Sequence, residues 1–404
     1  MTAFKTLDDL TSAHPDLTGK RILVRGDLNV PMANGAVGDR TRLVRLAPTL
    51  KELADAGAKV LVLSHFGRPK GAPDPAFSLK PVADALAETM GHAVSFAPDC
   101  VGDSAAQAIE ALDNGGVLVL ENLRFHAGET VNDDSFASQL AALGDIYVND
   151  AFSAAHRAHA STAALAGKLP AYAGRLMAAE LTALNKALGQ PECPVVALVG
   201  GAKVSTKLDL LQNLVTKVDT LVLGGGMANT FIAANGGDVG SSLYEPDKLD
   251  AARAVNAAAE QSGCRILLPQ DGVMATALAP NQDTTTGPSD QVPDGQMILD
   301  IGPASVVDIN DALAEAKTVV WNGPMGAFET APFDQGSVAV GKTVSELTKA
   351  GALLSVAGGG DTVAALAHAG IEDDISYVSA AGGAFLEWLE GKELPGVKAL
   401  ENEA

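Results

Sequence analysis

Short apolar runs alternate with longer amphipathic stretches along almost all of this 404-residue chain. The runs are three to five residues long and predict strands at 21–24, 59–63, 117–120, 146–148, 195–199, 220–223, 318–320 and 353–356. The stretches between them are rich in Ala and Leu, and they predict helices that include 42–56, 81–90, 247–261 and 338–349. Continuous apolar strands separated by helices are typical of parallel βαβ units. The sequence therefore predicts the α/β class.

The length of the chain favours two domains, because one hydrophobic core seldom extends over 404 residues. A helical, Ala-rich segment at 173–188 ends in the Pro-punctuated sequence 189–194, after which strands begin again. We therefore expect two doubly wound, Rossmann-like parallel sheets, in domains at 1–173 and 190–390. A connecting helix at 174–189 would form the hinge between them.

The acidic balance limits the possible partners. The chain has a formal net charge of −21; residues 1–173 carry 15 basic and 20 acidic residues, and the remainder carries 13 and 29. This excess disfavours nucleic acid and anionic membranes, and an aromatic content of 4% argues against base-stacking platforms. An anionic substrate would need a local basic pocket.

Cysteine usage and the N-terminal sequence favour a cytoplasmic protein. Cys100, Cys193 and Cys264 show no metal-ligand spacing and are expected to be buried, reduced thiols. The first ten residues lack the pattern of a secretory signal, and no apolar stretch reaches the roughly 18 residues of a membrane span.

Arginine and histidine residues follow several predicted strands of the first half. Ligands of open α/β sheets bind beyond the carboxyl ends of the strands, and the arginine fork matches phosphate and carboxylate oxygens. A single such arginine is commonly solvated or caps a helix, and Asp27 and Asn29 could simply form the turn before Pro31. Together, however, the strand ends predict a pocket for a small, multiply charged anion, formed by Arg25, Asp27, Asn29, Arg42, His65, Arg68, Arg124, His126, His156, Arg157 and His159.

In the second half the strand ends carry glycine. The clusters are 200–201, 224–226, 358–360 and the segment 321–329. Glycine lets the backbone approach a ligand, although a single cluster is often only a tight turn, and a helix that starts there directs N–H groups at phosphate. Lys203 and Lys207 would share one face if a helix begins there, and Asp361 is placed to hold Mg²⁺. Neither a P-loop nor a Gly-x-Gly-x-x-Gly fingerprint is present.

In number and order these segments resemble phosphoglycerate kinase, from Arg-x-Asp-x-Asn-Val-Pro at 25–31 to Leu-Glu-Gly-Lys at 389–392. The resemblance covers about residues 17–398 and implies a glycolytic or gluconeogenic kinase. Such an enzyme transfers phosphate reversibly between MgATP and the carboxylate of 3-phosphoglycerate, giving 1,3-bisphosphoglycerate and MgADP, in line and after domain closure. The resemblance also implies a monomer whose segment 391–404 returns to the first domain.

The resemblance assigns roles by matching position. The implied 3-phosphoglycerate site comprises Asp27, Leu28, Asn29, Arg42, His65, Phe66, Gly67, Arg68, Arg124 and Arg157. The implied nucleotide site comprises Lys203, Lys207, Gly225, Gly226, Asn322, Pro324, Glu329 on the ribose, Gly359, Gly360, Asp361 with Mg²⁺, and Thr362. Phosphoryl transfer itself is expected to depend on Arg42, Lys203, Lys207, Gly382 and Gly383. The acceptor carboxylate is ionised at pH 7, so no general base is required.

The chain departs from the family pattern at several places. The segment 379–384 reads Ser-Ala-Ala-Gly-Gly-Ala, with Ala380 and Ala381 in place of Thr and Gly. Gly26 replaces an apolar residue, Asn229 stands where an aromatic residue is common, and 175–180 lacks the usual Glu-Lys pair. Three rival interpretations stay open. One is another carboxylate or carbamate kinase, and a second, for which Ala380 and Ala381 are the best argument, is a catalytically silent nucleotide or anion binder. The third, with least support, is a nicotinamide oxidoreductase.

Overall fold

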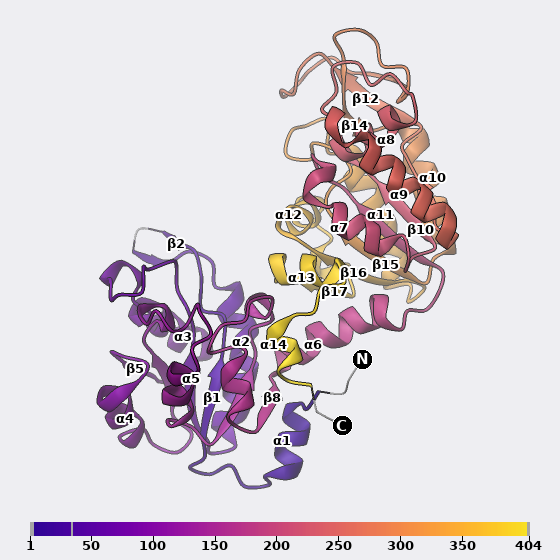
Figure 1. Ribbon diagram of the computed structural model, residues 1–404. Coiled ribbons are helices and arrows are strands. Elements are labelled where there is room, and N and C mark those ends of the chain that lie inside the picture. Colours follow the sequence, from indigo (N-terminus) through magenta and orange to yellow (C-terminus); the bar gives the residue numbers. More distant parts are fainter. Residues whose placement is uncertain (1–3, 34, 402–404) are drawn as a thin grey trace. The chain divides into compact units, whose positions relative to one another are not determined.

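The structure is a computed structural model that describes residues 4–33 and 35–401. It divides into two compact units (Figure 1). The first unit runs up to Thr182 and includes the C-terminal residues from Glu393, and the second unit comprises Ala183–Lys392. Helix α6 (Arg175–Leu184) and the π-helix Asn185–Gly189 follow one another where the chain passes from the first unit to the second.

The first unit is built on a six-stranded parallel sheet of order β5-β6-β4-β1-β7-β8. Its strands are β1 (Arg21–Arg25), β4 (Lys59–Leu63), β5 (Val94–Ala97), β6 (Val117–Leu120), β7 (Ile146–Asn149) and β8 (Ala171–Ala173). Its helices are α1 (Leu7–Ala13), α2 (Thr41–Asp55), α3 (Lys80–Met90), α4 (Gly102–Glu110), α5 (Asp134–Ala141) and α14 (Pro395–Lys398). A two-stranded hairpin, β2 (Met32–Ala33) and β3 (Ala36–Val37), follows β1.

The second unit contains a second parallel sheet, of order β11-β10-β9-β15-β16-β17. Its strands are β9 (Val195–Val199), β10 (Thr220–Leu223), β11 (Arg265–Leu267), β15 (Thr318–Asn322), β16 (Leu354–Gly358) and β17 (Tyr377–Ser379). Its helices are α7 (Leu208–Leu214), α8 (Gly225–Ala234), α9 (Leu249–Ser262), α10 (Pro303–Glu315), α11 (Gln335–Lys349), α12 (Gly360–Ala369) and α13 (Gly382–Leu389). A small antiparallel sheet adds β12 (Asp271–Ala275), β13 (Thr285–Pro288) and β14 (Met297–Ile301).

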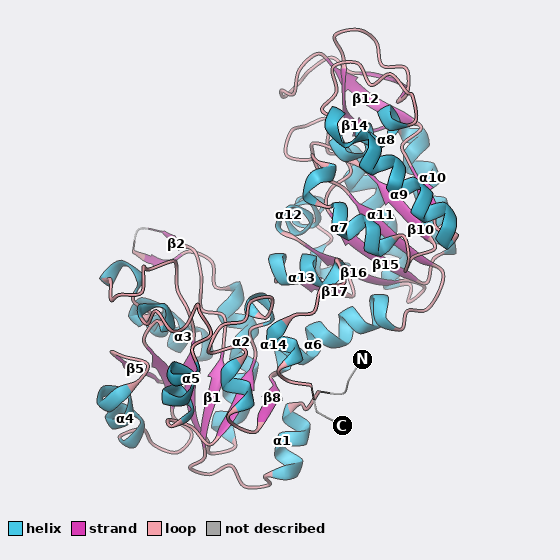
Figure 2. Ribbon diagram, viewed as in Figure 1, coloured by secondary structure: helices cyan, strands magenta, loops and turns pink. Residues whose placement is uncertain are grey.

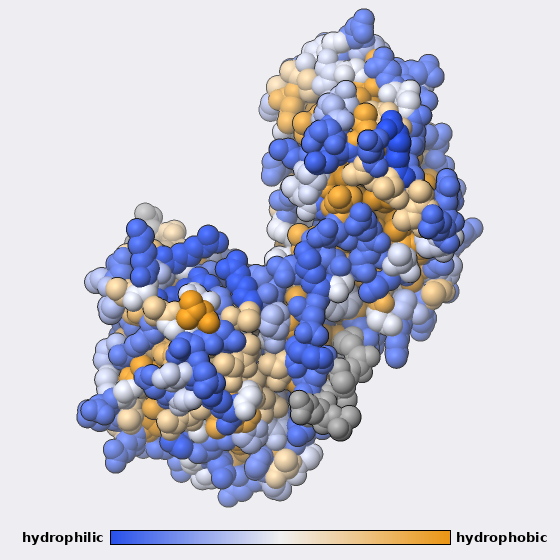
Figure 3. All heavy atoms as spheres, viewed as in Figure 1, coloured by the Kyte–Doolittle hydropathy of each residue, from blue (hydrophilic) through white to orange (hydrophobic). Residues whose placement is uncertain are grey.

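The apolar pattern explains these elements. Every residue of β6, β9 and β15 is buried, as expected for strands covered on both faces, and Figure 2 shows helices beside both parallel sheets. In α2 the buried side chains Leu43, Leu46, Leu50 and Leu53 recur at helical spacing. The face seen in Figure 3 is mainly hydrophilic, with scattered apolar side chains. The predicted fold class, α/β with two doubly wound parallel sheets, is confirmed.

The topology marks where ligands bind. In the first unit β1 leads to β4 on one side, whereas its neighbour β7 leads to β8 on the other. The same reversal separates β9 from β15 in the second unit. Ligands of open α/β sheets bind at such switch points, beyond the carboxyl ends of the strands.

The prediction that all three cysteines are buried is wrong for Cys193, which is exposed, whereas Cys100 and Cys264 are buried. Cys193 lies before Pro194, in the link between the π-helix and β9. Such links run over the surface, so this residue has no core to enter.

Candidate functional site

Three of the predicted arginines of the first unit, Arg68, Arg124 and Arg157, line one pocket of about 240 Å³. It lies beyond the ends of β1, β4, β6 and β7 and is lined by Asn29, His65, Gly67, Arg68, Arg124, Ser153, Ala154, His156, Arg157 and His159. We call it the arginine pocket. Three guanidinium groups in one small cavity give the arginine pocket the donors and the positive charge that suit an anion with several charges.

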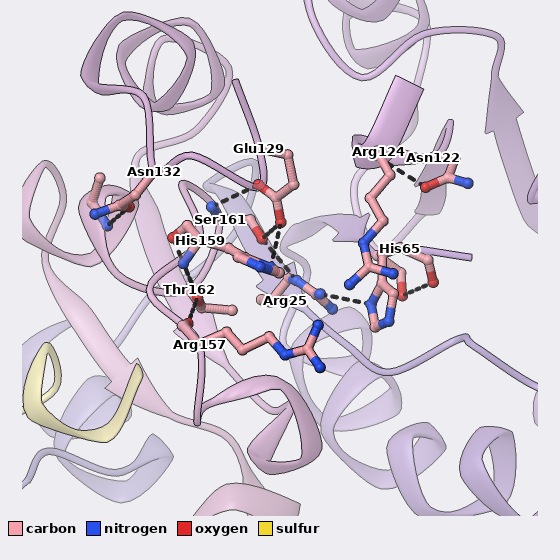
Figure 4. A network of polar contacts seen from close by, with 12 residues as sticks. Arg25, His65, Asn122, Arg124, Glu129, Asn132, Arg157, His159, Ser161 and Thr162 are labelled. Carbon is pink, nitrogen blue, oxygen red and sulfur yellow. Dashed lines mark hydrogen bonds and ion pairs between the residues drawn. The ribbon is translucent and has the colours of Figure 1, made fainter. Parts of the chain in front are cut away.

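A buried network holds one wall of the arginine pocket (Figure 4). Arg25 is fully buried and donates to Ser161 Oγ at 2.9 Å and to His65 Nδ1 at 3.0 Å. Ser161 Oγ in turn donates to Glu129 Oε1 at 2.6 Å. Since Arg25 uses Nδ1 as the acceptor, the neutral His65 ring carries its proton on Nε2 and can donate from there.

The two histidines beside Arg25 are uncharged at neutral pH. Burial lowers the pKa of His65 well below its usual value, and the charges of Arg25 and Arg124 add to the effect. Burial, with help from Arg124 and Arg25, lowers the pKa of His159 to about 4. Neither of these two histidines therefore adds positive charge to the arginine pocket.

One N–H donor of Arg124 has no hydrogen-bond acceptor among the described residues. Its Nη1 donates to the carbonyl of Gly67 at 2.7 Å, but its buried Nε has no partner. Burial, and then the nearby charges of Arg25 and Arg157, lower its pKa, yet an arginine remains charged. Buried donors are rarely left unpaired, so this one marks a position for a ligand oxygen.

The residues after β1 are arranged around Asp27, and Asn29 among them also lines the arginine pocket. Arg42 Nη1 donates to the carbonyl of Asn29 at 2.5 Å and lies 3.1 Å from Asp27 Oδ2. Asp27 also accepts from the Asn29 amide and the Ser153 hydroxyl, and Asn29 Oδ1 accepts from Gly67 N at 2.8 Å. Asp27 and Asn29 therefore order the loops, while Arg42 lies beside the arginine pocket without lining it.

Three other residues of the first half point elsewhere. The side chains of Leu28 and Phe66 are buried, and the backbone amide of Phe66 donates to Asn122 Oδ1 at 3.1 Å. His126, predicted with the basic set, instead hydrogen-bonds Asp99 at 2.7 Å and stacks on Phe136. Its position two residues beyond Arg124, past a short 3-10 turn (Leu123–Phe125), carries it away from the arginine pocket.

The second unit has a larger pocket, of about 390 Å³, whose walls are mainly apolar. We call it the apolar pocket. The predicted residues Gly225, Gly226, Pro324, Glu329 and Asp361 line it, and so do others outside the nucleotide site that the resemblance implies: Gly201, Ala202, Ala228, Asn229, Ile232, Leu243, Pro269, Leu278, Ser289, Met297, Ile298, Leu299, Asp300, Ile301, Met325, Gly326 and Ala327. Leu243 and Leu278 are each 54% exposed at its wall, which suits a flat apolar ligand.

Lys207 lies at the switch point between β9 and β15. Its Nζ donates to Gly200 O at 2.7 Å, to Asn322 Oδ1 at 2.6 Å and to Asn322 O at 3.0 Å. Burial lowers the pKa of Lys207 to about 8, although the charge of Asp361 acts in the opposite direction. The strands approach so closely here that a Cβ on Gly200 would lie 1.7 Å from Pro324 O.

The start of α12 offers backbone donors beside this lysine. Gly359 has a φ of +97°, which favours glycine, and Gly360 begins the helix. Asp361 is exposed in the first turn, whereas buried Thr362 accepts from Gly323 N at 2.7 Å and donates to Gly358 O at 2.8 Å. The first amides of α12 are thus available to phosphate, and Thr362 holds the loop that presents them.

The prediction that Lys203 and Lys207 share one helix face is wrong. A 3-10 turn, Val204–Thr206, separates them, and α7 begins only at Leu208. Val204 is buried and Thr206 Oγ1 bonds Lys203 O at 2.9 Å, so Lys203 stays exposed while Lys207 turns inward.

The glycines at the start of α8 also act differently from a phosphate-binding helix start. The Gly225 amide donates to Met325 O at 2.9 Å, and the Met227 amide donates to Gly201 O at 3.0 Å. These glycines instead form a bare surface of the apolar pocket. Gly382 and Gly383 are exposed at the start of α13.

Sequence reasoning missed Glu129 and Ser161 as partners of Arg25. Ser161 is 136 residues from Arg25 in the sequence, and Glu129 is 32 residues from Ser161. No local pattern links them; the only signal was that an arginine directly after a buried strand needs a counter-charge.

No helix among the described residues has the length and apolar character needed to cross a membrane.

Comparisons with known proteins agree with this geometry. The family model described as phosphoglycerate kinase matches residues 10–392. Curated relatives named phosphoglycerate kinase include one from Rhodospirillum centenum, 64% identical over 98% of this chain and 99% of its own, and one from Methylorubrum extorquens strain PA1, 62% identical over 99% of each. The solved phosphoglycerate kinase of Coxiella burnetii is 42% identical, with a TM-score of 0.91 over 98% of this chain and 99% of that one.

These matches cover nearly the whole chain, and they confirm both the resemblance seen in the sequence and the prediction of a kinase. The chain belongs to the phosphoglycerate kinase family.

Proposed function

We propose that this chain transfers a phosphoryl group reversibly between ATP and the carboxylate of 3-phosphoglycerate, giving 1,3-bisphosphoglycerate and ADP. The observation that carries the proposal is the arginine pocket, with the unpaired Nε of Arg124 at its wall. The doubly charged phosphate of 3-phosphoglycerate would take the forks of Arg68, Arg124 and Arg157, and His65 and Asn29 would contact its other oxygens.

The nucleotide would occupy the apolar pocket of the second unit. Its base would lie on the bare backbone of Gly225 and Gly226, and Glu329 would contact the ribose. Lys203, Lys207 and the first amides of α12 would bind the phosphates, where Gly359, Gly360 and Thr362 shape the loop and Asn322 holds Lys207.

Asp361 suits a nucleotide-bound Mg²⁺. Its carboxylate is exposed at the start of α12, near Lys207, and makes no hydrogen bond or ion pair with the described residues. Mg²⁺ usually takes one or two carboxylates and completes its shell with phosphate oxygens and water. When bound, the ion neutralises phosphate charge, and Asp361 would hold it in place.

The reaction needs alignment and charge neutralisation. A carboxylate oxygen of 3-phosphoglycerate forms a bond to the γ-phosphorus while the bond from that phosphorus to the ADP oxygen breaks, and no proton is transferred. Arg42, Lys203 and the amides of Gly382 and Gly383 would neutralise the moving group, and Lys207 would neutralise the leaving phosphate. Because the two substrates belong to different units, transfer requires domain closure, which would also exclude water.

The enzyme would act as a monomer in the cytoplasm. Family resemblance is the basis for the monomer, and light scattering of the purified chain measures it directly. A mass near twice the 41.1 kDa of one chain would contradict it.

The activity is tested by coupling turnover to glyceraldehyde-3-phosphate dehydrogenase and following NADH loss. Oxidation should require both 3-phosphoglycerate and MgATP, and it should stop when Mg²⁺ is chelated. In a direct ADP-release assay, acetate, aspartate and carbamate should not replace 3-phosphoglycerate, which separates this proposal from another carboxylate or carbamate kinase.

Binding of both substrates without turnover would instead identify a catalytically silent binder. That result would point to Ala380 and Ala381, which precede Gly382 and Gly383 at the start of α13.

A further inference from the structure

Asn229 is a buried polar side chain in the wall of the apolar pocket. It lies on α8 (Figure 1), one turn beyond Gly225 and Gly226 and one turn before Ile232, and all four residues line the pocket. Asn229 is 2% exposed, and its neighbours in the wall are mainly aliphatic. An amide in such a wall is costly to bury unless both of its ends find partners.

One contact fixes the orientation of the Asn229 amide. Nδ2 donates to the backbone oxygen of Leu243 at 3.1 Å. A flipped amide would place two acceptors against each other there, so the nitrogen faces Leu243 and Oδ1 faces away from it. No described residue donates to Oδ1. Arg124 Nε is a fully buried atom without a hydrogen-bond partner, but Asn229 Oδ1 is not one of these fully buried atoms. A ligand can therefore reach this acceptor.

The other buried polar side chains of the wall are already engaged. The Ser289 hydroxyl donates to Pro269 O. The Asp300 carboxylate accepts the amides of Ile301 at 2.9 Å and Gly336 at 2.7 Å. Asn229 Oδ1 is thus an acceptor that the wall leaves to whatever base occupies it.

We propose that Asn229 recognises the exocyclic amine of a 6-aminopurine, so that the apolar pocket prefers adenine nucleotides to 6-oxopurine nucleotides. The inference rests on the proposed function, which places the nucleotide in this pocket. An amine at C6 donates to Oδ1, whereas a carbonyl at C6 would set two acceptors against each other. A site that hydrogen-bonds one substituent rejects the analogue that lacks the donor.

The test compares MgADP with MgIDP, which differ in this donor, by calorimetric titration of the full chain. The unaltered protein should bind MgADP more tightly, and Asn229→Leu should reduce the ratio of the two affinities by about 2- to 12-fold, the range for one neutral hydrogen bond. Because the ratio is taken within each variant, a general loss of folded protein does not alter it.

Ser289→Ala is the matched control, since it removes a polar group from the same wall and should leave the ratio unchanged. An equal ratio in the unaltered chain and in Asn229→Leu would overturn the inference, and so would a fall confined to Ser289→Ala.

Turnover with 3-phosphoglycerate separates this inference from the proposed function. A preference for MgADP over MgIDP without turnover would support the inference and contradict the proposed function. Turnover without that preference would support the proposed function and contradict the inference. Binding of neither nucleotide would sink both.

Discussion

At the scale of single residues, a buried base and a buried acid beside the arginine pocket belong to one hydrogen-bonded network. Arg25 and Glu129 are both fully buried, and Ser161 joins them. Their charges offset one another within the network, so Arg68, Arg124 and Arg157 remain as the cations that face the arginine pocket.

Lys207 should make nucleotide use depend on pH. Burial lowers its pKa to about 8, so its ammonium is charged below that pH and neutral above it. We expect kcat/KM for MgATP to fall as the pH rises through about 8, because a neutral amine binds phosphate poorly. The measurement is the coupled rate against pH, with coupling enzyme in excess. A flat profile between about pH 7 and 9 would count against this role, and a Lys207→Arg variant that stays active should lose the inflection.

Arg42 should affect turnover more than binding. It lies beside the arginine pocket, where it is paired with Asp27. If its guanidinium neutralises the transferring group, Arg42→Ala should lower kcat by about 100-fold or more while changing the KM for 3-phosphoglycerate much less. Arg40→Ala is the control, since Arg40 pairs with Glu88 at the surface and should not be needed. A near-normal kcat in Arg42→Ala would refute the role.

At the scale of elements, glycine sets the spacing of β9 and β15. No Cβ fits at Gly200, which faces Pro324 O. Gly200→Ala should push the two strand ends apart, lower the free energy of unfolding by about 1–3 kcal/mol and weaken nucleotide binding. Urea unfolding and MgADP titration measure the two effects.

The matched control for that substitution is Gly167→Ala, whose Cβ would meet no atom within 4 Å. It should leave stability and nucleotide binding near their normal values. If Gly200→Ala matches this control, the close approach of β9 and β15 does not limit the site.

Asp300 lies in β14, and its carboxylate accepts the amide of Gly336 at the start of α11. The ionisation of this carboxyl should make the free energy of unfolding depend on pH. Burial raises its pKa to about 7, above the ordinary value of 3.8. The protonated form is therefore favoured in the folded state, and its contribution to stability is lost as the pH rises from about 4 to about 7. This contribution is at most on the order of 4 kcal/mol. Asp150, whose pKa is raised to about 6 by burial, acts in the same direction.

Asp300→Asn should remove part of that slope in urea unfolding measured between about pH 5 and 8. The control is Asp308→Asn on α10, where Asp308 accepts an exposed hydrogen bond from Gln270, and this variant should leave the slope unchanged. An unaltered slope in Asp300→Asn would show that this carboxyl ionises normally.

The elements that could be predicted from the sequence are those with strong local patterns. The strands at 59–63, 117–120, 195–199 and 220–223 have the predicted bounds, because a strand buried on both faces is a continuous apolar run. The sheet of β12, β13 and β14 was not predicted: β13 is mainly exposed and ends in Gly287 and Pro288, which weaken the strand signal.

Site geometry was less predictable than the fold. The strand-end arginines could be found because topology alone brings strand ends together. The inward turn of Lys207 and the exposure of Lys203 could not, since they depend on a 3-10 turn and on contacts with the distant residue Asn322.

At the scale of the whole molecule, the two pockets lie in different units of one chain. The arginine pocket belongs to the first unit and the apolar pocket to the second. Each unit presents its ligand edge at the switch point of its own parallel sheet. The proposed reaction therefore assigns 3-phosphoglycerate to the first unit and the nucleotide to the second.

The most direct test of that division is calorimetric titration of 3-phosphoglycerate and of MgATP, each alone, into two variants. Arg157→Ala removes an arginine of the first unit's pocket, and Lys203→Ala removes an exposed lysine of the second unit. We predict a crossed result: Arg157→Ala weakens binding of 3-phosphoglycerate by about tenfold or more and leaves MgATP unchanged, and Lys203→Ala does the opposite. If either variant weakened both ligands equally, the assignment of one substrate to each unit would be contradicted.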